Sequence, residues 1–158
     1  MRSFHLAKIT DNKSQIHFSV TLDDTLYIRG QRDLLRQALT NLLLNGIWAV
    51  NKKWEQAQLE DWAGSICGSI YADGDWACLS ICDNGVGMSA DVVSRCMEPF
   101  FTTKMAGTGL GLALAKQCVE NSSGTMSIRS EENQYTEILI RFPQYRPDDG
   151  QADSEVKH

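Results

Sequence analysis

The stretch Gly-Thr-Gly-Leu-Gly-Leu at residues 107–112 has residue types that suit the binding of a phosphate group. Glycines at alternate positions let the chain turn and present bare backbone N–H groups to an anion. The apolar residues 112–115 predict a helix directly behind the glycines, whose N-terminus would add unpaired donors and the positive end of the helix dipole. By itself, the stretch fits a flexible turn before an ordinary helix equally well.

A second group of polar residues falls inside residues 31–52, the segment that most clearly predicts a helix. Asn41 and Asn45 are four residues apart and therefore lie on one helical face. Because asparagine is a weak helix former, two of them in mid-helix favour a functional role. The alternative is a solvated polar face, but this face also carries Trp48 and has no lysine or glutamate before Lys52.

A third group begins where a predicted strand at residues 76–82 runs into Asp83. The two glycines that follow, Gly85 and Gly87, leave exposed backbone beside this carboxylate at the edge of a sheet. Residues 100–104 then read Phe-Phe-Thr-Thr-Lys, and we interpret the two phenylalanines as a hinge that anchors one end of a mobile segment.

The remaining pattern predicts the elements that must position these groups. Strands are predicted by alternation or by β-rich runs between turn residues at 16–20, 26–28, 66–71, 76–82, 125–129 and 136–142. The first two strands predict an antiparallel hairpin, and Asp-Gly between the next two predicts another. Helices are predicted at 31–52, with an extension and loop at 51–64, after Ser89 as far as Pro99, and at 110–121. The long helix is expected to bury Leu35, Leu39, Leu42, Leu43, Gly46 and Val50.

Composition limits the class of protein. The chain has 158 residues, of which 42% are apolar and 22% charged, and its formal net charge is −5, as in a soluble globular domain. A mildly acidic chain without a basic cluster argues against nucleic acid as a partner, and no apolar run approaches the roughly 20 residues of a membrane span. The five cysteines form no Cys-x-x-Cys pair, which argues against a zinc site. We divide the chain into a leader or interdomain linker at 1–14, a domain at 15–145 and a disordered polar tail at 146–158.

The order of these parts resembles the ATP-binding catalytic domain of bacterial sensor histidine kinases. The matching parts are the asparagine-bearing helix, Asp-Asn-Gly-Val-Gly, Phe-Phe-Thr-Thr-Lys, Gly-x-Gly-x-Gly and the two closing strands, which together cover about residues 16–143. The run Glu-Pro-Phe-Phe-Thr-Thr-Lys at 98–104 nearly matches one common histidine-kinase subtype. The resemblance implies the α+β fold shared with DNA gyrase, the large heat-shock chaperone and the mismatch-repair ATPases. In this Bergerat ATP-binding fold, a two-layer α/β sandwich, about three helices cover one face of a mixed, mostly antiparallel sheet of about five strands.

The resemblance also implies a role for each matched residue. Asn45 matches the asparagine whose amide oxygen binds Mg²⁺, and Asn41 would face the same cavity near the phosphates. Asp83 matches the acid that accepts a hydrogen bond from the exocyclic amine of adenine, and Thr136 matches a hydroxyl that supports this contact. Lys104 would hold the triphosphate together with the backbone of the glycine-rich stretch.

Further roles follow from the same match. Gly85 and Gly87 would leave room for the base and ribose, and residues 101–107 would form a nucleotide lid. The implied catalytic residues are Asn41, Asn45 and Lys104, with Asn45 as the protein ligand of Mg²⁺. The implied ATP-binding residues are Asn41, Asn45, Asp83, Gly85, Gly87, Phe101, Thr102, Thr103, Lys104, Gly107, Thr108, Gly109, Leu110, Gly111, Leu112 and Thr136.

ATP and Mg²⁺ are therefore the implied cofactors, and phosphoryl transfer to a histidine is the implied reaction. The implied partners are a dimerisation domain that bears this histidine, in the same parent protein or on another chain, and indirectly a response regulator. His5, His17 and His158 lie in a leader, a strand and a tail, so we expect the acceptor elsewhere. We expect neither nucleic-acid binding nor membrane insertion by this chain, and a cytoplasmic location with any membrane anchor in a parent protein.

Two other functions stay open. The first is a nucleotide-binding or degenerate regulatory module of the same fold, which two departures from the family pattern favour. Gln31 stands where aspartate is frequent, and Trp48 stands where lysine or arginine is frequent, so one phosphate contact would be missing. The second is a serine kinase of the anti-sigma type, but that family usually has glutamate at the position of Asn41. Without this base, hydrolysis should be slow and transfer to an acceptor side chain is favoured.

Overall fold

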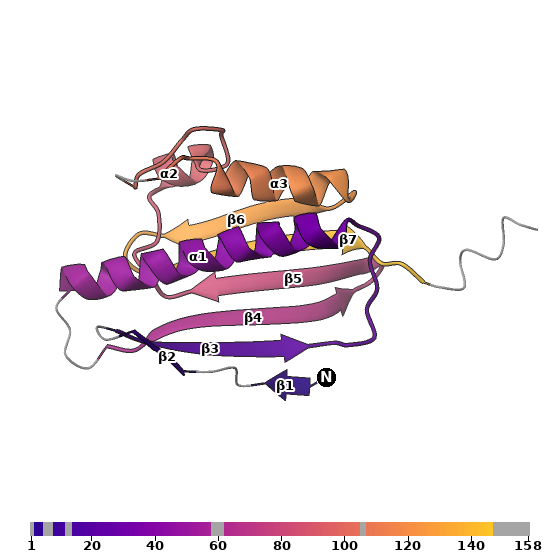
Figure 1. Ribbon diagram of the computed structural model, residues 1–158, viewed down its shortest axis with the longest axis horizontal. Helices are drawn as coiled ribbons and strands as arrows, with labels where there is room; N and C mark the ends of the chain where they lie inside the picture. The colour runs from indigo at the N-terminus through magenta and orange to yellow at the C-terminus, as the bar shows by residue number, and fades with distance from the viewer. Residues whose placement is uncertain (1, 5–7, 12–13, 58–61, 105–106, 147–158) are drawn as a thin grey trace, which may run out of the picture.

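The computed structural model describes residues 2–4, 8–11, 14–57, 62–104 and 107–146, in which helices cover one face of a single sheet (Figure 1). Its helices are α1 (Arg32–Ala57), α2 (Ala90–Arg95) and α3 (Gly111–Asn121). Its strands are β1 (Arg2–Phe4), β2 (Lys8–Asp11), β3 (Ser14–Leu22), β4 (Gly64–Asp73), β5 (Trp76–Asp83), β6 (Thr125–Glu131) and β7 (Tyr135–Pro143). The predicted tail, from residue 147 onward, and residues 58–61 of the predicted loop lie outside the described residues.

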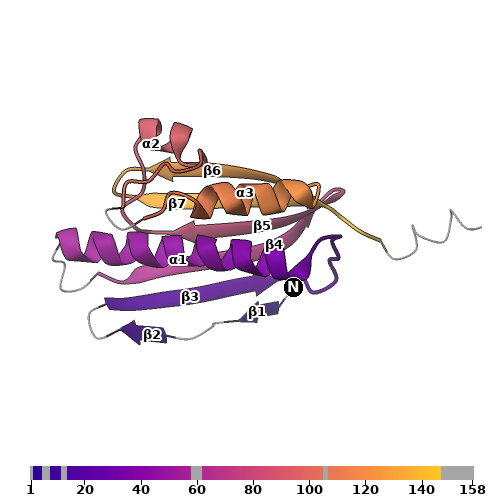
Figure 2. The same ribbon diagram turned by 45° about the horizontal axis from the view of Figure 1, so that its top comes forward.

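The sheet has the strand order β1-β3-β4-β5-β7-β6, and β2 pairs with the same strand as β1 does. Strands β3 and β4 run parallel, whereas the other described pairs are antiparallel. Helix α1 supplies the long crossover that a parallel pair requires. Both views show α1 and α3 side by side on the same face (Figures 1 and 2). The predicted two-layer α+β sandwich is confirmed, with β1 and β2 as additional short strands inside the predicted leader.

The core lies between this sheet and the two long helices. Leu42 and Val50 of α1 and Val119 of α3 are buried against sheet residues such as Ile66. Leu43 was expected on the same buried face, but 39% of its surface is exposed. Val50 lies seven residues further along α1, and therefore on nearly the same helical face, yet it is fully buried, so the exposure of Leu43 depends on what packs over that turn and not on its helical angle.

A conservative core substitution should show how tightly this layer is packed. Ile140 of β7 is 1% exposed, so Ile140→Val would remove a fully enclosed methylene group. We expect the free energy of unfolding to fall by about 1 kcal/mol in a urea titration. The matched control is Ile28→Val, because Ile28 is 36% exposed and should lose less than about 0.5 kcal/mol. Equal losses at the two positions would contradict the described core.

The predicted hairpin between residues 16–20 and 26–28 is wrong. The first run lies within β3, but residues 26–28 form no strand. One edge of β3 is already paired with β1 and β2, and its other edge is paired with β4, so no edge remains for a further strand. Instead, the carbonyl oxygen of Tyr27 accepts a hydrogen bond from the backbone of Tyr145 at 2.7 Å.

The helices and strands next to the candidate site agree with those predicted from the sequence. The hairpin of β4 and β5 turns through Gly74, whose φ of 61° explains the glycine of the Asp-Gly signal. The hydroxyl oxygen of Ser89 accepts a hydrogen bond from the backbone of Val92, so the predicted cap starts α2. Helix α1 runs to Ala57, which confirms the predicted extension beyond residue 52. These elements bring the end of β5, the middle of α1 and the start of α3 to one region.

Candidate functional site

A cavity of about 610 Å³ lies among α1, the end of β5 and the segment that precedes α3. This volume falls in the range of small-molecule pockets. The structure brings most of the predicted site residues to its wall, namely Asn45, Asp83, Gly87, Phe101, Thr102, Thr103, Lys104, Gly107, Thr108, Gly109, Gly111, Leu112 and Thr136. Asn41, Gly85 and Leu110 are not among the lining residues, so any contact of theirs with a ligand stays a prediction.

At one end of the cavity lies the carboxylate of Asp83, the last residue of β5. Asp83 is only 7% exposed, and its burial raises the pKa of the carboxyl group to about 6. A 2.9 Å hydrogen bond from the backbone N–H of Gly85 to Oδ1, and the charge of Lys53, act in the opposite direction. Helix α1 passes close by at Gly46, where a Cβ atom would lie 3.6 Å from Oδ2 of Asp83.

Thr136 lies directly across from Asp83 in the register of β5 and β7, and it is also 7% exposed. Its hydroxyl group is 3.0 Å from that of Ser130 on β6. The Ser130 oxygen also accepts a hydrogen bond from the backbone of Met88 at 2.8 Å. The predicted acid and the predicted hydroxyl are thus neighbours on one sheet face. Ser130 was missed, and its only signal was a polar residue on a face that also carries Ile128.

The two glycines after Asp83 are required by the protein's own backbone. A Cβ atom at Gly85 would lie 2.5 Å from the carbonyl carbon of Ala49 in α1. At Gly87, which has a φ of 61°, it would overlap the carbonyl oxygen of Glu131. The sequence suggested that both glycines leave room for a ligand. In the structure, close approach of the chain to itself gives a sufficient reason for each, although Gly87 also lines the cavity.

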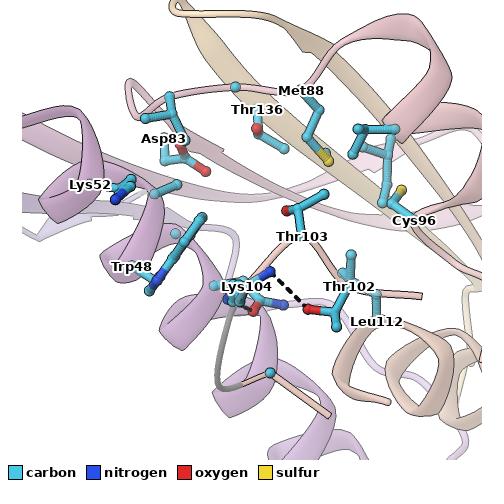
Figure 3. A pocket seen from close by; sticks show the side chains of 18 of the residues that line it. Trp48, Lys52, Asp83, Met88, Cys96, Thr102, Thr103, Lys104, Leu112 and Thr136 are labelled. Atoms are coloured by element: carbon cyan, nitrogen blue, oxygen red, sulfur yellow. Dashed lines mark hydrogen bonds between the residues drawn. The ribbon is translucent and has the colours of Figure 1, made fainter. Parts of the chain in front are cut away.

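Toward the other end of the cavity, the ammonium group of Lys104 contacts two residues of α1, one of which is Trp48, labelled in Figure 3. Its Nζ donates a 2.6 Å hydrogen bond to Oδ1 of Asn45 and lies 4.6 Å from the centroid of the Trp48 ring. Burial lowers the pKa of Lys104. The backbone N–H of Lys104 donates to the hydroxyl of Thr102 at 3.1 Å. The contact with Trp48 joins residues that are remote in sequence and was not predicted.

The glycine-rich stretch closes this end of the cavity. Gly109 has a φ of 67°, and its carbonyl oxygen accepts a 2.9 Å hydrogen bond from the backbone of Phe100. The ring of Phe101 lies 4.5 Å from the guanidinium carbon of Arg95, whereas Phe100 is 77% exposed. Leu110, the N-cap of α3, makes no side-chain cap hydrogen bond to the first helical turn, although its own backbone N–H donates to the hydroxyl of Thr108 at 3.4 Å. The backbone donors of this first turn are suited to an anion.

Other kinds of site find little support among the residues that the structure describes. Within them, no group of three or more histidine, cysteine or acidic residues could hold a metal ion. All five cysteines are free. None of the described helices is both long and apolar enough to cross a bilayer.

Comparison with known proteins agrees with the geometry. Residues 30–146, well over half of the chain, match the family described as histidine kinase-, DNA gyrase B- and HSP90-like ATPases. The chain belongs to this ATPase family. Sensor histidine kinase ZraS of Escherichia coli K12 is 33% identical over 142 residues, which cover 89% of this chain and 28% of ZraS. Sporulation kinase E of Bacillus subtilis is 34% identical over 134 residues, which cover 84% of this chain and 17% of that kinase. This ATPase domain therefore spans less than a third of the length of these relatives.

Solved structures give the same result for the fold. The ATPase domain is similar to the mycobacterial sensor histidine kinase MprB, with a TM-score of 0.67, 28% identity and 82% coverage of each chain. It also resembles the nucleotide-free catalytic domain of histidine kinase ThkA, with a TM-score of 0.62 and coverage of 80% of this chain and 76% of that one. At 24% identity, this second likeness concerns the fold alone. The chain is thus a histidine-kinase-type ATPase domain.

Proposed function

We propose that this domain binds Mg-ATP and donates the γ-phosphoryl group to a histidine on a separate dimerisation domain, as the catalytic part of a two-component sensor kinase. One observation carries the proposal: the buried carboxylate of Asp83 and the amide of Asn45 line the same cavity, together with the glycine-rich start of α3. Asp83 could bind the purine base of a nucleotide while the phosphates of the same nucleotide reach Asn45. The relatives named above support the kinase reaction, and a response regulator would receive the phosphoryl group next.

The recognition of adenine would depend on Asp83. Oδ1 of this carboxylate is occupied by the backbone N–H of Gly85, which leaves Oδ2 to accept a hydrogen bond from the exocyclic amine of adenine. Guanine has a carbonyl oxygen at that position, and two acceptors would repel each other. Thr136 lies directly across the sheet and could support the base, either directly or through water.

The phosphates would lie between Lys104, Asn45 and the backbone of the glycine-rich stretch. The amide oxygen of Asn45 is a hard donor of the type that Mg²⁺ prefers, and this ion often takes its remaining ligands from phosphates and water. The donor fits such an ion, because Asn45 lines the cavity and its Oδ1 already accepts a hydrogen bond from the cationic Lys104, a contact that bound Mg²⁺ would replace. Bound Mg²⁺ would neutralise phosphate charge during the transfer. No carboxylate stands at Asn41, one turn before Asn45, to activate water, so transfer is favoured over hydrolysis.

Replacing Asn45 tests the role of the phosphate end. In the intact domain, Mg²⁺ is expected to strengthen ATP binding in titration calorimetry. In Asn45→Ala, this dependence on Mg²⁺ should be lost, while adenosine should bind as before because its contacts lie at Asp83. A variant that still responds to Mg²⁺ would contradict the assignment of Asn45 as the metal ligand.

The reaction itself needs a second measurement. With radiolabelled ATP and the histidine-bearing dimerisation domain of the parent protein, acid-labile phosphate should form on that domain. If ATP binds but no phosphate is transferred, the chain is a nucleotide-binding regulatory module. If no ATP binds at millimolar concentration, the chain is neither a kinase nor a nucleotide-binding module but a degenerate interaction module of the same fold.

A further inference from the structure

One ammonium group at the cavity is held by a single face of α1. Asn45 and Trp48 are three residues apart and therefore neighbours on the helix surface. The first accepts a 2.6 Å hydrogen bond from Nζ of Lys104, and the ring of the second lies 4.6 Å from the same atom. The distance is well inside the limit of about 6 Å for a cation–π contact. Figure 3 shows the Trp48 ring beside the Lys104 side chain, on the side of the cavity away from Thr136.

The contacts of this cation leave room for an anion. Lys104 is half-buried, and burial lowers its pKa. Among the described residues, its side chain enters no ion pair with a carboxylate, and one hydrogen bond uses one of its three donors. A neutral amide oxygen and an aromatic face therefore balance the charge in part. A partly desolvated ammonium group with free donors in a cavity is suited to phosphate oxygens.

We propose that Trp48 is a positioning residue for the triphosphate: its ring holds the ammonium group of Lys104 at α1 when Mg²⁺ takes the amide oxygen of Asn45, so that the donors of Lys104 meet phosphate oxygens. The inference rests on the proposed nucleotide site and adds the residue that orients its cation. Trp48 has no charge of its own and acts through Lys104. This gives a physical role to a residue that departs from the family pattern, in which a cation often stands at this position.

Trp48 has two other possible roles, and each makes a different prediction. If the ring stacked on adenine, its removal would weaken adenosine and ATP equally. If it only packed against the wall of the cavity, its effect would be the same with or without Lys104. A positioning role requires instead that the effect falls on phosphate-bearing ligands and disappears when Lys104 is absent. A double-mutant cycle with several ligands separates these cases.

The experiment measures Kd values for ATP, adenosine and inorganic tripolyphosphate, all with Mg²⁺, in the intact domain and in Trp48→Leu, Trp48→Phe, Lys104→Ala and Trp48→Leu/Lys104→Ala. We expect Trp48→Leu to weaken the binding of ATP and of tripolyphosphate about three- to tenfold, and the binding of adenosine less than about twofold. In the Lys104→Ala background, the same change should alter ATP binding by less than about twofold. Trp48→Phe keeps an aromatic face and should recover most of the affinity. The control Trp76→Leu changes a residue of β5 that does not line the cavity, and it should leave all three ligands unchanged.

A readout without nucleotide separates failure of this inference from failure of the proposed function. The ring current of Trp48 should shift the ε-methylene protons of Lys104 upfield in the NMR spectrum of the intact domain, and Trp48→Leu should remove that shift. If the shift is present but neither ATP nor tripolyphosphate binds, the nucleotide site is refuted. The inference is refuted on its own if ATP binds but the shift is absent. The inference would also be refuted if Trp48→Leu weakened adenosine binding as much as ATP binding. It would be refuted too if Trp48→Leu weakened ATP binding as much in the Lys104→Ala variant as in the intact domain.

Discussion

Asp83→Asn is expected to weaken ATP binding about 10- to 100-fold and, at the same time, to make the nucleotide-free domain more stable at neutral pH. The loss of affinity follows because the substitution replaces a charge-assisted hydrogen bond to the adenine amine, in a buried place, with a neutral one. The gain in stability follows because the carboxylate is 7% exposed and ionises there at a cost. A residue kept for ligand recognition at the expense of stability is typical of binding sites.

The sign of the stability change follows from the pKa of Asp83. Burial raises this pKa from 3.8 to about 6, so between about pH 4 and pH 6 the folded chain binds a proton that the unfolded chain does not. The free energy of unfolding therefore falls as the pH rises through this window, and the penalty is fully present above pH 6. Two pKa units correspond to a few kcal/mol, so we expect Asp83→Asn to add about 1–3 kcal/mol at pH 7.5.

Urea titrations at pH 4.5 and pH 7.5 measure this difference. The gain of Asp83→Asn over the intact domain should be present at pH 7.5 and much smaller at pH 4.5. Asp24→Asn removes the same charge from an exposed turn and should change stability by less than about 0.5 kcal/mol at either pH. ATP binding to the intact domain should weaken as the pH falls through 6, because the protonated acid presents one acceptor fewer. A destabilised Asp83→Asn with unchanged ATP affinity would contradict both parts.

Gly87→Ala is the second change with a large expected effect, and it should destabilise the domain by more than about 3 kcal/mol. Gly87 has a φ of 61°, and a Cβ atom there would overlap the backbone carbonyl oxygen of Glu131, the last residue of β6. The backbone must therefore move, and with it Met88, whose N–H is held by Ser130. Because Gly87 lines the cavity, ATP affinity should fall together with stability.

Gly74 provides a matched control for this substitution. It has the same φ of 61°, but a Cβ atom there would meet nothing within 4 Å. Gly74→Ala should therefore lose only about 1–2 kcal/mol, which is the cost of the left-handed conformation. The difference between the two variants isolates the clash with β6. Similar losses in both variants would mean that Gly87 is not packed against Glu131 as described.

Much of the fold could be predicted because its strands carry a strong local signal. Residues 136–142 alternate between buried and partly buried positions in β7, and the Asp-Gly turn marks the hairpin of β4 and β5. The error at residues 26–28 has a physical cause. An apolar run resembles a strand whether or not a free edge is available, and both edges of β3 are taken by segments remote from this run. Pairing partners are a property of the whole sheet.

In the candidate site too, some residues could be identified from the sequence, whereas contacts between remote segments could not. Asn45 was singled out as a weak helix former in mid-helix and Asp83 as an acid at the end of a strand, and the family resemblance supplied their roles; both line the cavity. The contact of Lys104 with Trp48 could not be predicted, since it depends on how the segment before α3 approaches α1. For Gly85, the residue type indicated a close approach, but sequence cannot tell whether a ligand or the protein's own helix makes it. Here Ala49 of α1 does so.

The central claim is that Asp83 and Asn45 bind the two ends of one Mg-ATP molecule, and an NMR titration of backbone amides tests it most directly. With Mg-ATP, the amides of Asp83, Gly87, Asn45 and Gly111 should shift together and follow a single Kd. With adenosine, the shifts should be confined to the region of Asp83 and Gly87. Shifts at one end only, two different Kd values for the two ends, or no shift at millimolar Mg-ATP would contradict the account.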